Sequence, residues 1–137
     1  MKPLKFKALL KTTIWGGEEV TKLKNLTDAP RQVGESWEIS GVPGNETPVC
    51  CGPEQGSTLE QLIEKHGAEL VGKKNLERYG TTFPLLIKFI DAKDPLSVQV
   101  HPGNDYAKRV EGEYGKTEMW YIVDAEPGAS LLYGFKE

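Results

Sequence analysis

The chain has 137 residues, of which 38% are hydrophobic and 27% charged, with a formal net charge of −3. This length suffices for one domain with a buried core. The negative charge and dispersed lysines argue against a general nucleic-acid-binding surface, and no apolar run reaches the roughly 18 to 20 residues that span a bilayer. We therefore expect one globular domain, residues 1–137, that binds neither nucleic acid nor membrane.

The cysteines and the N-terminal segment indicate the compartment. Cys50 and Cys51 are adjacent, and a disulfide between neighbours would be strained, so we expect two free thiols. Free thiols are typical of a reducing cytoplasm, and a four-cysteine zinc site would need a second pair that the sequence lacks. Lysines interrupt the apolar residues of the N-terminal segment, which is unlike a signal peptide. We expect a cytoplasmic location.

The first third of the chain predicts short strands separated by turns. Leu4–Leu10 is a candidate edge strand, which the glycines of Ile14–Gly17 end because glycine permits turn conformations. Lys22–Gln32 is polar and is interpreted as a loop. Gly34–Ser40 alternates as a strand does, and Thr47–Cys51 is a further short strand after a Pro-Gly-Asn turn.

The middle of the chain predicts a helix. Ser57 followed by Glu60 has the spacing of a capping box, and apolar residues then recur at helical spacing, so we expect a helix over Thr58–His66. His66 at its end is expected to be solvated, with its charge favoured by the helix dipole. A brief helical piece at Ala68–Leu70 and a loop lead to the next strand.

Phe83–Ala92 is apolar on both faces, which is typical of a strand buried on both sides. Lys88 interrupts this run, and a buried ammonium group is costly unless it reaches water or an anion. Two interpretations stay open. The Lys88 side chain extends to the surface, or it binds an anionic ligand.

Leu96–His101 alternates with period two, which places Ser97, Gln99 and His101 on one face of a predicted strand. A helix capped by Asn104 is expected over Asn104–Val110.

The last third of the chain adds two predicted strands, Lys116–Val123 and Ala129–Tyr133, around a turn at Glu126–Gly128. The period-two rule puts Lys116 and Glu118 on one face of the first of these. Short strands between proline and glycine turns, with one or two helices, indicate a mainly β sandwich or barrel.

If the two polar strand faces line one cavity, an amide oxygen, an imidazole and a carboxylate converge beside a lysine. Gln99, His101 and Glu118 offer O, N and O donors, which suit zinc or another borderline divalent ion. The alternative is a polar strand that faces solvent.

Four segments add a resemblance to a known family. They are IWGG (14–17), GESWEIS (34–40), FPLLIKFIDAKDPLSVQVHP (83–102) and GKTEMWYI (115–122). In this order, over nearly the whole chain, they resemble type I phosphomannose isomerase. The resemblance implies a cupin fold, a jelly-roll or double-stranded β-helix whose mouth holds one zinc ion. It also implies interconversion of mannose 6-phosphate and fructose 6-phosphate through an enediol.

Carried over position by position, the resemblance assigns a role to six residues. It implies that Gln99, His101 and Glu118 bind zinc, that Lys88 and Ser97 line the sugar-phosphate pocket, and that Lys116 lies at the catalytic centre. Family members are longer and supply a further histidine ligand and an arginine from a later segment. We therefore expect an N-terminal part that is truncated before the C-terminal segment, an incomplete cupin whose exposed strand edges invite a homodimer.

Two functions stay open. The first is a zinc-dependent aldose–ketose isomerase, whole or as a fragment that is inactive alone, in which Lys116 serves as the base or stabilises the enediolate. The second is a non-catalytic cupin module that binds a sugar phosphate or a partner chain. A metal-dependent oxygenase fits less well, because such enzymes use two histidines and a carboxylate.

Overall fold

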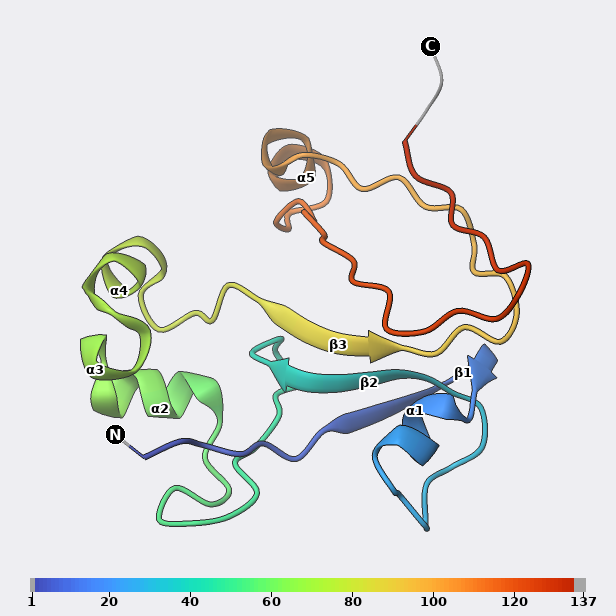
Figure 1. Cartoon of the computed structure of the whole chain (residues 1–137). Coiled ribbons are helices and arrows are strands. Elements are labelled where there is room, and N and C mark those ends of the chain that lie inside the picture. Colours follow the sequence, from blue (N-terminus) through green and yellow to red (C-terminus); the bar gives the residue numbers. More distant parts are fainter. Residues whose placement is uncertain (1, 135–137) are drawn as a thin grey trace. The chain divides into compact units, whose positions relative to one another are not determined.

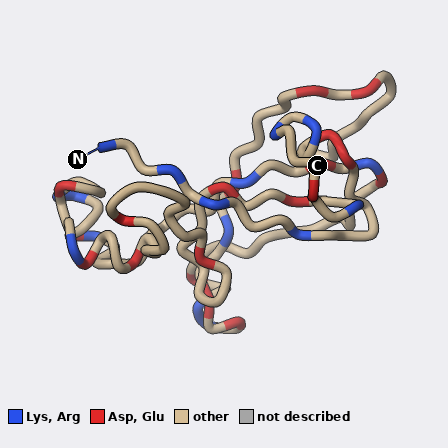
Figure 2. The backbone as a smooth tube through the Cα atoms, turned by 90° about the horizontal axis from the view of Figure 1, so that it is seen from below, with Lys and Arg blue, Asp and Glu red and all other residues tan. Residues whose placement is uncertain are grey.

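A computed structural model describes residues 2–134. The chain divides into two compact units, the first ending at Leu96 and the second beginning at Ser97. No helix among the described residues is long and apolar enough to cross a membrane. Basic and acidic residues are interspersed along the backbone (Figure 2).

The first unit contains a three-stranded antiparallel sheet. Its strands are β1 (Leu9–Gly17), β2 (Val33–Ser40) and β3 (Leu86–Ile90), with β2 in the centre (Figure 1). The strand predicted at Gly34–Ser40 is confirmed. β3 lies inside the apolar run 83–92 but is an edge strand, and Ile87 is 47% exposed. The prediction that this run is buried on both faces is therefore wrong, because the face that carries Leu85 and Ile87 is exposed.

The boundaries predicted for the first strand are wrong. β1 begins at Leu9 and continues through Gly16 and Gly17, neither of which has a positive φ. A Cβ at Gly16 would collide with the carbonyl oxygen of Gln32. Gly16 thus allows a close backbone approach inside the strand, and Gly17 leaves room for the Asp91 carboxylate, so neither glycine ends the strand. The strand predicted over 47–51 is reduced to an isolated bridge between Val49 and Phe6.

Five short helices occur in the described residues, more than the one or two expected. Those of the first unit are α1 (Glu19–Leu23), α2 (Leu59–His66), α3 (Ala68–Val71) and α4 (Lys73–Tyr79). α4 lies where a loop was predicted, because its seven residues fit between two glycines with positive φ, Gly72 and Gly80. A segment this short between two glycines does not contain enough apolar residues for a helical period to be recognised in the sequence.

α2 confirms the predicted helix, with its cap one residue away from the predicted position. Thr58 accepts a hydrogen bond from the Gln61 amide, and the Gln61 side chain accepts one from the Thr58 amide at 3.0 Å. The capping box is therefore formed by Thr58 and Gln61 instead of Ser57 and Glu60. His66 is half-buried and lies 2.9 Å from a Glu54 carboxylate oxygen, so the prediction of a solvated histidine is wrong.

The core of the first unit forms around β2 and α2. Its apolar side chains with at most 2% exposure are Val33, Val49, Leu62 and Ile63. A buried polar pair lies within it, where the Ser40 amide donates to the Thr47 hydroxyl at 2.9 Å. Burial of this kind keeps the sheet and the helix in one unit.

The second unit has one helix, α5 (Asn104–Val110), as predicted. Its N-cap is Gly103, whereas the Asn104 side chain accepts a hydrogen bond from the Gly115 amide at 3.1 Å. The predicted turn at Glu126–Gly128 is also present, closed by a 3.0 Å hydrogen bond from the Ala129 amide to Glu126.

The three strands predicted in this part of the chain are not formed. Leu96–His101, Lys116–Val123 and Ala129–Tyr133 make no β-bridge within residues 97–134. A strand requires a hydrogen-bonded neighbour, and period-two alternation specifies only which side chains share a face. The apolar face expected to be buried is open as well, with Val98 and Val100 more than 70% exposed.

Candidate metal centre

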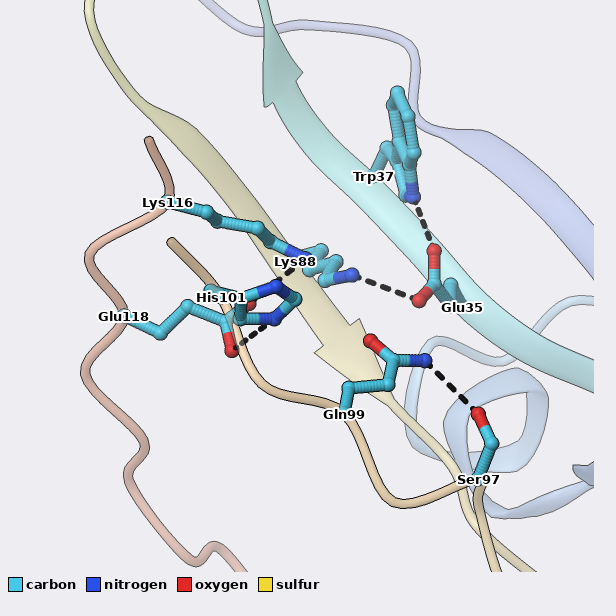
Figure 3. Close-up of polar contacts among 8 residues, drawn as sticks. All are labelled: Glu35, Trp37, Lys88, Ser97, Gln99, His101, Lys116 and Glu118. Atoms are coloured by element: carbon cyan, nitrogen blue, oxygen red, sulfur yellow. Dashed lines mark hydrogen bonds and ion pairs between the residues drawn. The ribbon is translucent and has the colours of Figure 1, made fainter. Parts of the chain in front are cut away.

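The second unit brings together two of the three predicted metal ligands. His101 Nε2 lies 3.4 Å from Glu118 Oε2, and each side chain is 28% exposed (Figure 3). The two donors are 17 residues apart in sequence, in the extended segments before and after α5. The convergence of imidazole and carboxylate expected from the alternation is therefore found, although neither segment is a strand.

The spacing of this pair fits a divalent ion. Zinc binds imidazole nitrogen and carboxylate oxygen at about 2.0 to 2.2 Å, and two such ligands on a tetrahedral ion lie about 3.4 Å apart. The His101 and Glu118 donor atoms have this separation. No group of three or more His, Cys, Asp or Glu side chains that could hold a metal occurs in residues 2–134. A third ligand from these residues would therefore be of another type, such as a side-chain amide.

Gln99 is the predicted neutral ligand. Its amide nitrogen donates to the Ser97 hydroxyl at 3.0 Å, and its amide oxygen points away from Ser97 (Figure 3). The hydrogen bond uses the amide nitrogen of Gln99, which cannot bind a cation, and leaves its amide oxygen available as a metal ligand. Ser97, expected at the sugar-phosphate pocket, is here a partner of a predicted ligand.

Lys116 pairs with the carboxylate of the same site. Its ammonium nitrogen lies 3.0 Å from Glu118 Oε1, while His101 is next to the other oxygen. Partial burial raises the pKa of Glu118, but the hydrogen bond and charge of Lys116, with help from Trp120 and His101, lower it overall below the usual range. Glu118 is thus ionised at neutral pH, as a metal ligand must be.

A glycine explains how Glu118 comes to His101. A Cβ at Gly115 would lie 2.5 Å from the Pro102 carbonyl oxygen and 2.7 Å from the Asn104 amide nitrogen. Only glycine fits this approach, which sets the segment after Gly115 beside the one that ends in His101. The sequence analysis did not identify this role of Gly115. Its only indication in the sequence is that Gly115 stands just before Lys116 and Glu118.

Lys88 belongs to the first unit, on β3. Its ammonium nitrogen lies 2.7 Å from Glu35 Oε1 on β2, and Glu35 Oε2 accepts a 2.6 Å hydrogen bond from the Trp37 indole (Figure 3). The Lys88 and Glu35 side chains are 16% and 18% exposed. The lysine therefore reaches an anion supplied by the chain itself, and Glu35 is a member of this polar cluster that the sequence analysis did not single out.

Comparisons with known proteins give the family. The model of the phosphomannose isomerase type I catalytic domain matches residues 4–127. The chain belongs to this family. Mannose-6-phosphate isomerase of Streptococcus mutans is 41% identical over 132 residues, which are 96% of this chain and 40% of that protein. Mannose-6-phosphate isomerase ManA of Bacillus subtilis is 42% identical over 133 residues, with the same two coverages.

A solved structure extends the likeness to the fold. The crystal structure of the mannose 6-phosphate isomerase from Bacillus subtilis superposes with a TM-score of 0.80 at 38% identity, over 92% of this chain and 39% of that one. The predicted mainly β, incomplete cupin-like fold is thereby confirmed. The chain spans about 40% of the length of the relatives it matches.

Proposed function

We propose that this type I phosphomannose isomerase chain contributes to a zinc-dependent aldose–ketose isomerase that interconverts mannose 6-phosphate and fructose 6-phosphate. The observation that carries the proposal is the 3.4 Å separation of His101 Nε2 and Glu118 Oε2 in a chain of this family. Catalysis by this chain alone is not part of the proposal, because it spans about 40% of its relatives' length.

Gln99, His101 and Glu118 are the residues that would hold the zinc ion, or another divalent ion. When bound, the ion would act as a Lewis acid for the negative charge that develops on the sugar oxygens. The donors of Gln99 and His101 are neutral, and Glu118 brings the single negative charge. This set leaves a net positive centre, which favours an anionic sugar phosphate.

Lys116 is the proposed catalytic residue. Aldose–ketose isomerisation moves a proton between C1 and C2, and a negatively charged enediolate forms on the way. The Lys116 ammonium, held 3.0 Å from Glu118, can stabilise that charge directly. To act as the base it must first give up its own proton, so both roles of Lys116 remain in the proposal.

Lys88 and Ser97 are the proposed contacts to the sugar phosphate. Lys88 Nζ already binds a carboxylate oxygen in a half-buried setting, and a phosphate oxygen is another anionic acceptor for its N–H groups. The Ser97 hydroxyl, which accepts from Gln99, still has its own proton to donate.

Complementation tests the isomerase proposal. The chain would be mixed with zinc and with the part of the Bacillus subtilis ManA protein that it does not cover, and mannose 6-phosphate would be followed by NMR. We expect fructose 6-phosphate to form in the mixture, and its rate to fall by roughly 10²-fold or more with Lys116→Met. No turnover in any mixture with zinc would overturn the proposal.

The second candidate is a non-catalytic module that binds a sugar phosphate. The partial coverage of the relatives favours it, since residues 2–134 offer three candidate ligands and contain no group of three or more His, Cys, Asp or Glu side chains that could complete a site. Calorimetry with mannose 6-phosphate distinguishes the two candidates. Binding without turnover in the complemented mixture supports the module, and turnover rules it out.

We also propose that the extended segments of the second unit pair with those of a second copy. Val98, Val100, Met119 and Tyr121 are all more than 70% exposed, and their backbone makes no bridge within residues 97–134. Unpaired extended backbone with apolar side chains favours strand pairing between chains. Sedimentation would show a dimer, which Tyr121→Lys weakens; a monomer at every concentration would contradict this.

We further propose a cytoplasmic location, which the exposed free thiols support.

A further inference from the structure

The two cysteines of the first unit point their sulfur atoms toward each other. Cys50 Sγ and Cys51 Sγ are 3.7 Å apart, and both residues are exposed. Adjacent side chains on extended backbone point to opposite sides. Here the chain bends at Cys51 and continues through Gly52 with φ of +88°, which brings both thiols to one side.

The backbone that carries this pair is held from both sides. The Cys50 amide donates to the Lys5 carbonyl at 2.8 Å, next to the bridge between Phe6 and Val49. The Val49 amide donates to the Ser57 carbonyl at 3.0 Å, and the Gly56 amide donates back to Val49 at 2.9 Å. The dithiol therefore lies on a closed loop whose ends are fixed, so less conformational entropy is lost when both sulfurs bind one ligand.

We propose that Cys50 and Cys51 form a bidentate site for one thiophilic divalent ion of the zinc group. Thiolates at about 2.3 Å from a tetrahedral ion lie about 3.8 Å apart, which is close to the observed 3.7 Å. Soft thiolate ligands select such ions over the hard cations that prefer oxygen. Because both residues are exposed, water completes the coordination.

The chemistry of binding is an exchange of protons for the metal. The Sγ–Sγ hydrogen bond is the main reason why the pKa of the Cys50 thiol is raised, while the charge of Lys5 lowers it. A divalent ion replaces both thiol protons: two S–H bonds break, two metal–sulfur bonds form, and two protons pass to water. No oxidant is needed. The site is independent of the proposed zinc centre, which lies in the second unit.

Cadmium titration of the reduced full-length chain tests the site, followed by thiolate-to-metal absorbance in the ultraviolet. We expect the signal to saturate at one ion per chain, and both thiols to lose their reactivity toward a disulfide reagent together. Cys51→Ser and Cys50→Ser should each weaken binding by roughly 10²-fold or more, because the second sulfur acts at high effective concentration. His101→Ala should leave the absorbance signal unchanged.

Two results would overturn the inference. The first is equal cadmium affinity in the wild type and in Cys51→Ser, which would mean that one sulfur suffices. The second is one ion for two chains by native mass spectrometry, which would mean that the thiols bridge molecules instead of chelating. Since both cysteines are exposed, serine at either position should leave the circular dichroism spectrum intact and keep the test interpretable.

Discussion

The two units of this chain differ in how they satisfy their backbone and bury their apolar side chains. The first has a hydrogen-bonded sheet, and Leu62 and Ile63 are at most 1% exposed. The second has one helix and long extended segments, with Met119 and Tyr133 more than 90% exposed. Yet the family match runs through both, over residues 4–127.

The difference shows that candidate ligands can come together in a part of the chain that has no paired sheet and little buried core. All three proposed metal ligands belong to the second unit, where His101 and Glu118 meet through a helix and a tightly packed glycine. Local contacts such as Asn104 with Gly115 are enough to bring donors together. Strand pairing requires neighbours that residues 97–134 do not supply, and among the apolar side chains of these residues only that of Ala107 is buried.

The largest effect is expected in the core of the first unit. Leu62→Ala should lower the free energy of unfolding by about 2 to 5 kcal/mol, because Leu62 is completely buried and its truncation leaves a cavity. The matched control in the second unit is Met119→Ala, at a side chain that is 92% exposed, with an expected change within about 0.5 kcal/mol. Urea unfolding followed by circular dichroism measures both. Comparable losses would show that Met119 is packed in solution.

The second effect concerns the glycine that shapes the metal centre. Gly115→Ala should weaken zinc binding by about 10- to 100-fold, because its Cβ would push the segment carrying Glu118 away from His101. Gly103→Ala is the control, since nothing lies within 4 Å of a Cβ there and its φ of −68° suits alanine. Competition with a fluorescent zinc chelator gives the affinities, with both cysteines replaced by serine in every protein compared. A similar affinity in all three proteins would mean that Gly115 does not position the ligands.

The lysine–glutamate pairs of the two units should differ in strength. Lys88 and Glu35 are each under a fifth exposed, so a double-mutant cycle with Lys88→Met and Glu35→Gln should give a coupling of about 1 kcal/mol. Lys116 is 46% exposed, so its pair with Glu118 should be weaker and more easily screened by salt. Repeating both cycles at high salt tests the ranking; stronger or salt-insensitive coupling in the second pair would reverse it.

The smallest effect is on one half-buried carboxylate of the first unit, that of Glu54. The hydrogen bond from Lys65, followed by that from His66, lowers the pKa of Glu54 below its ordinary value of 4.5. Because the folded-state pKa is the lower one, Glu54 favours folding at pH above 4.5 and loses this contribution as the pH falls. Lys65→Met should raise the pKa toward 4.5 in carboxyl NMR titrations, and Lys73→Met should not. An unchanged pKa in Lys65→Met would contradict the assigned cause.

Much of the first unit could be predicted from local pattern. Alternation located β2, and apolar spacing located α2, because both elements bury one face inside the same unit. The extent of β1 was missed, since Gly16 lies against the chain before β2 and Gly17 against the Asp91 side chain after β3, and only tertiary structure reveals these contacts. α4 was missed because glycines at both ends resemble a loop.

The residues of the candidate site could be predicted from the sequence, but the backbone structure that holds them could not. Period two placed Gln99 and His101 on one face and Lys116 and Glu118 on another, and the resemblance gave each of them a role. The expected strands did not form, because alternation carries no information about a hydrogen-bonded partner. Likewise, the sequence raised the question of what Lys88 binds, but its partner Glu35 is 53 residues away and could not be named.

Zinc binding by the chain with both cysteines replaced by serine tests the central claim most directly. Metal content by mass spectrometry would be compared between this protein and the same protein with His101→Ala. The account predicts one zinc per chain in the first and loss of zinc in the second, because His101 supplies the single nitrogen of the set. Absence of zinc from both, or equal zinc in both, would contradict a metal centre at Gln99, His101 and Glu118.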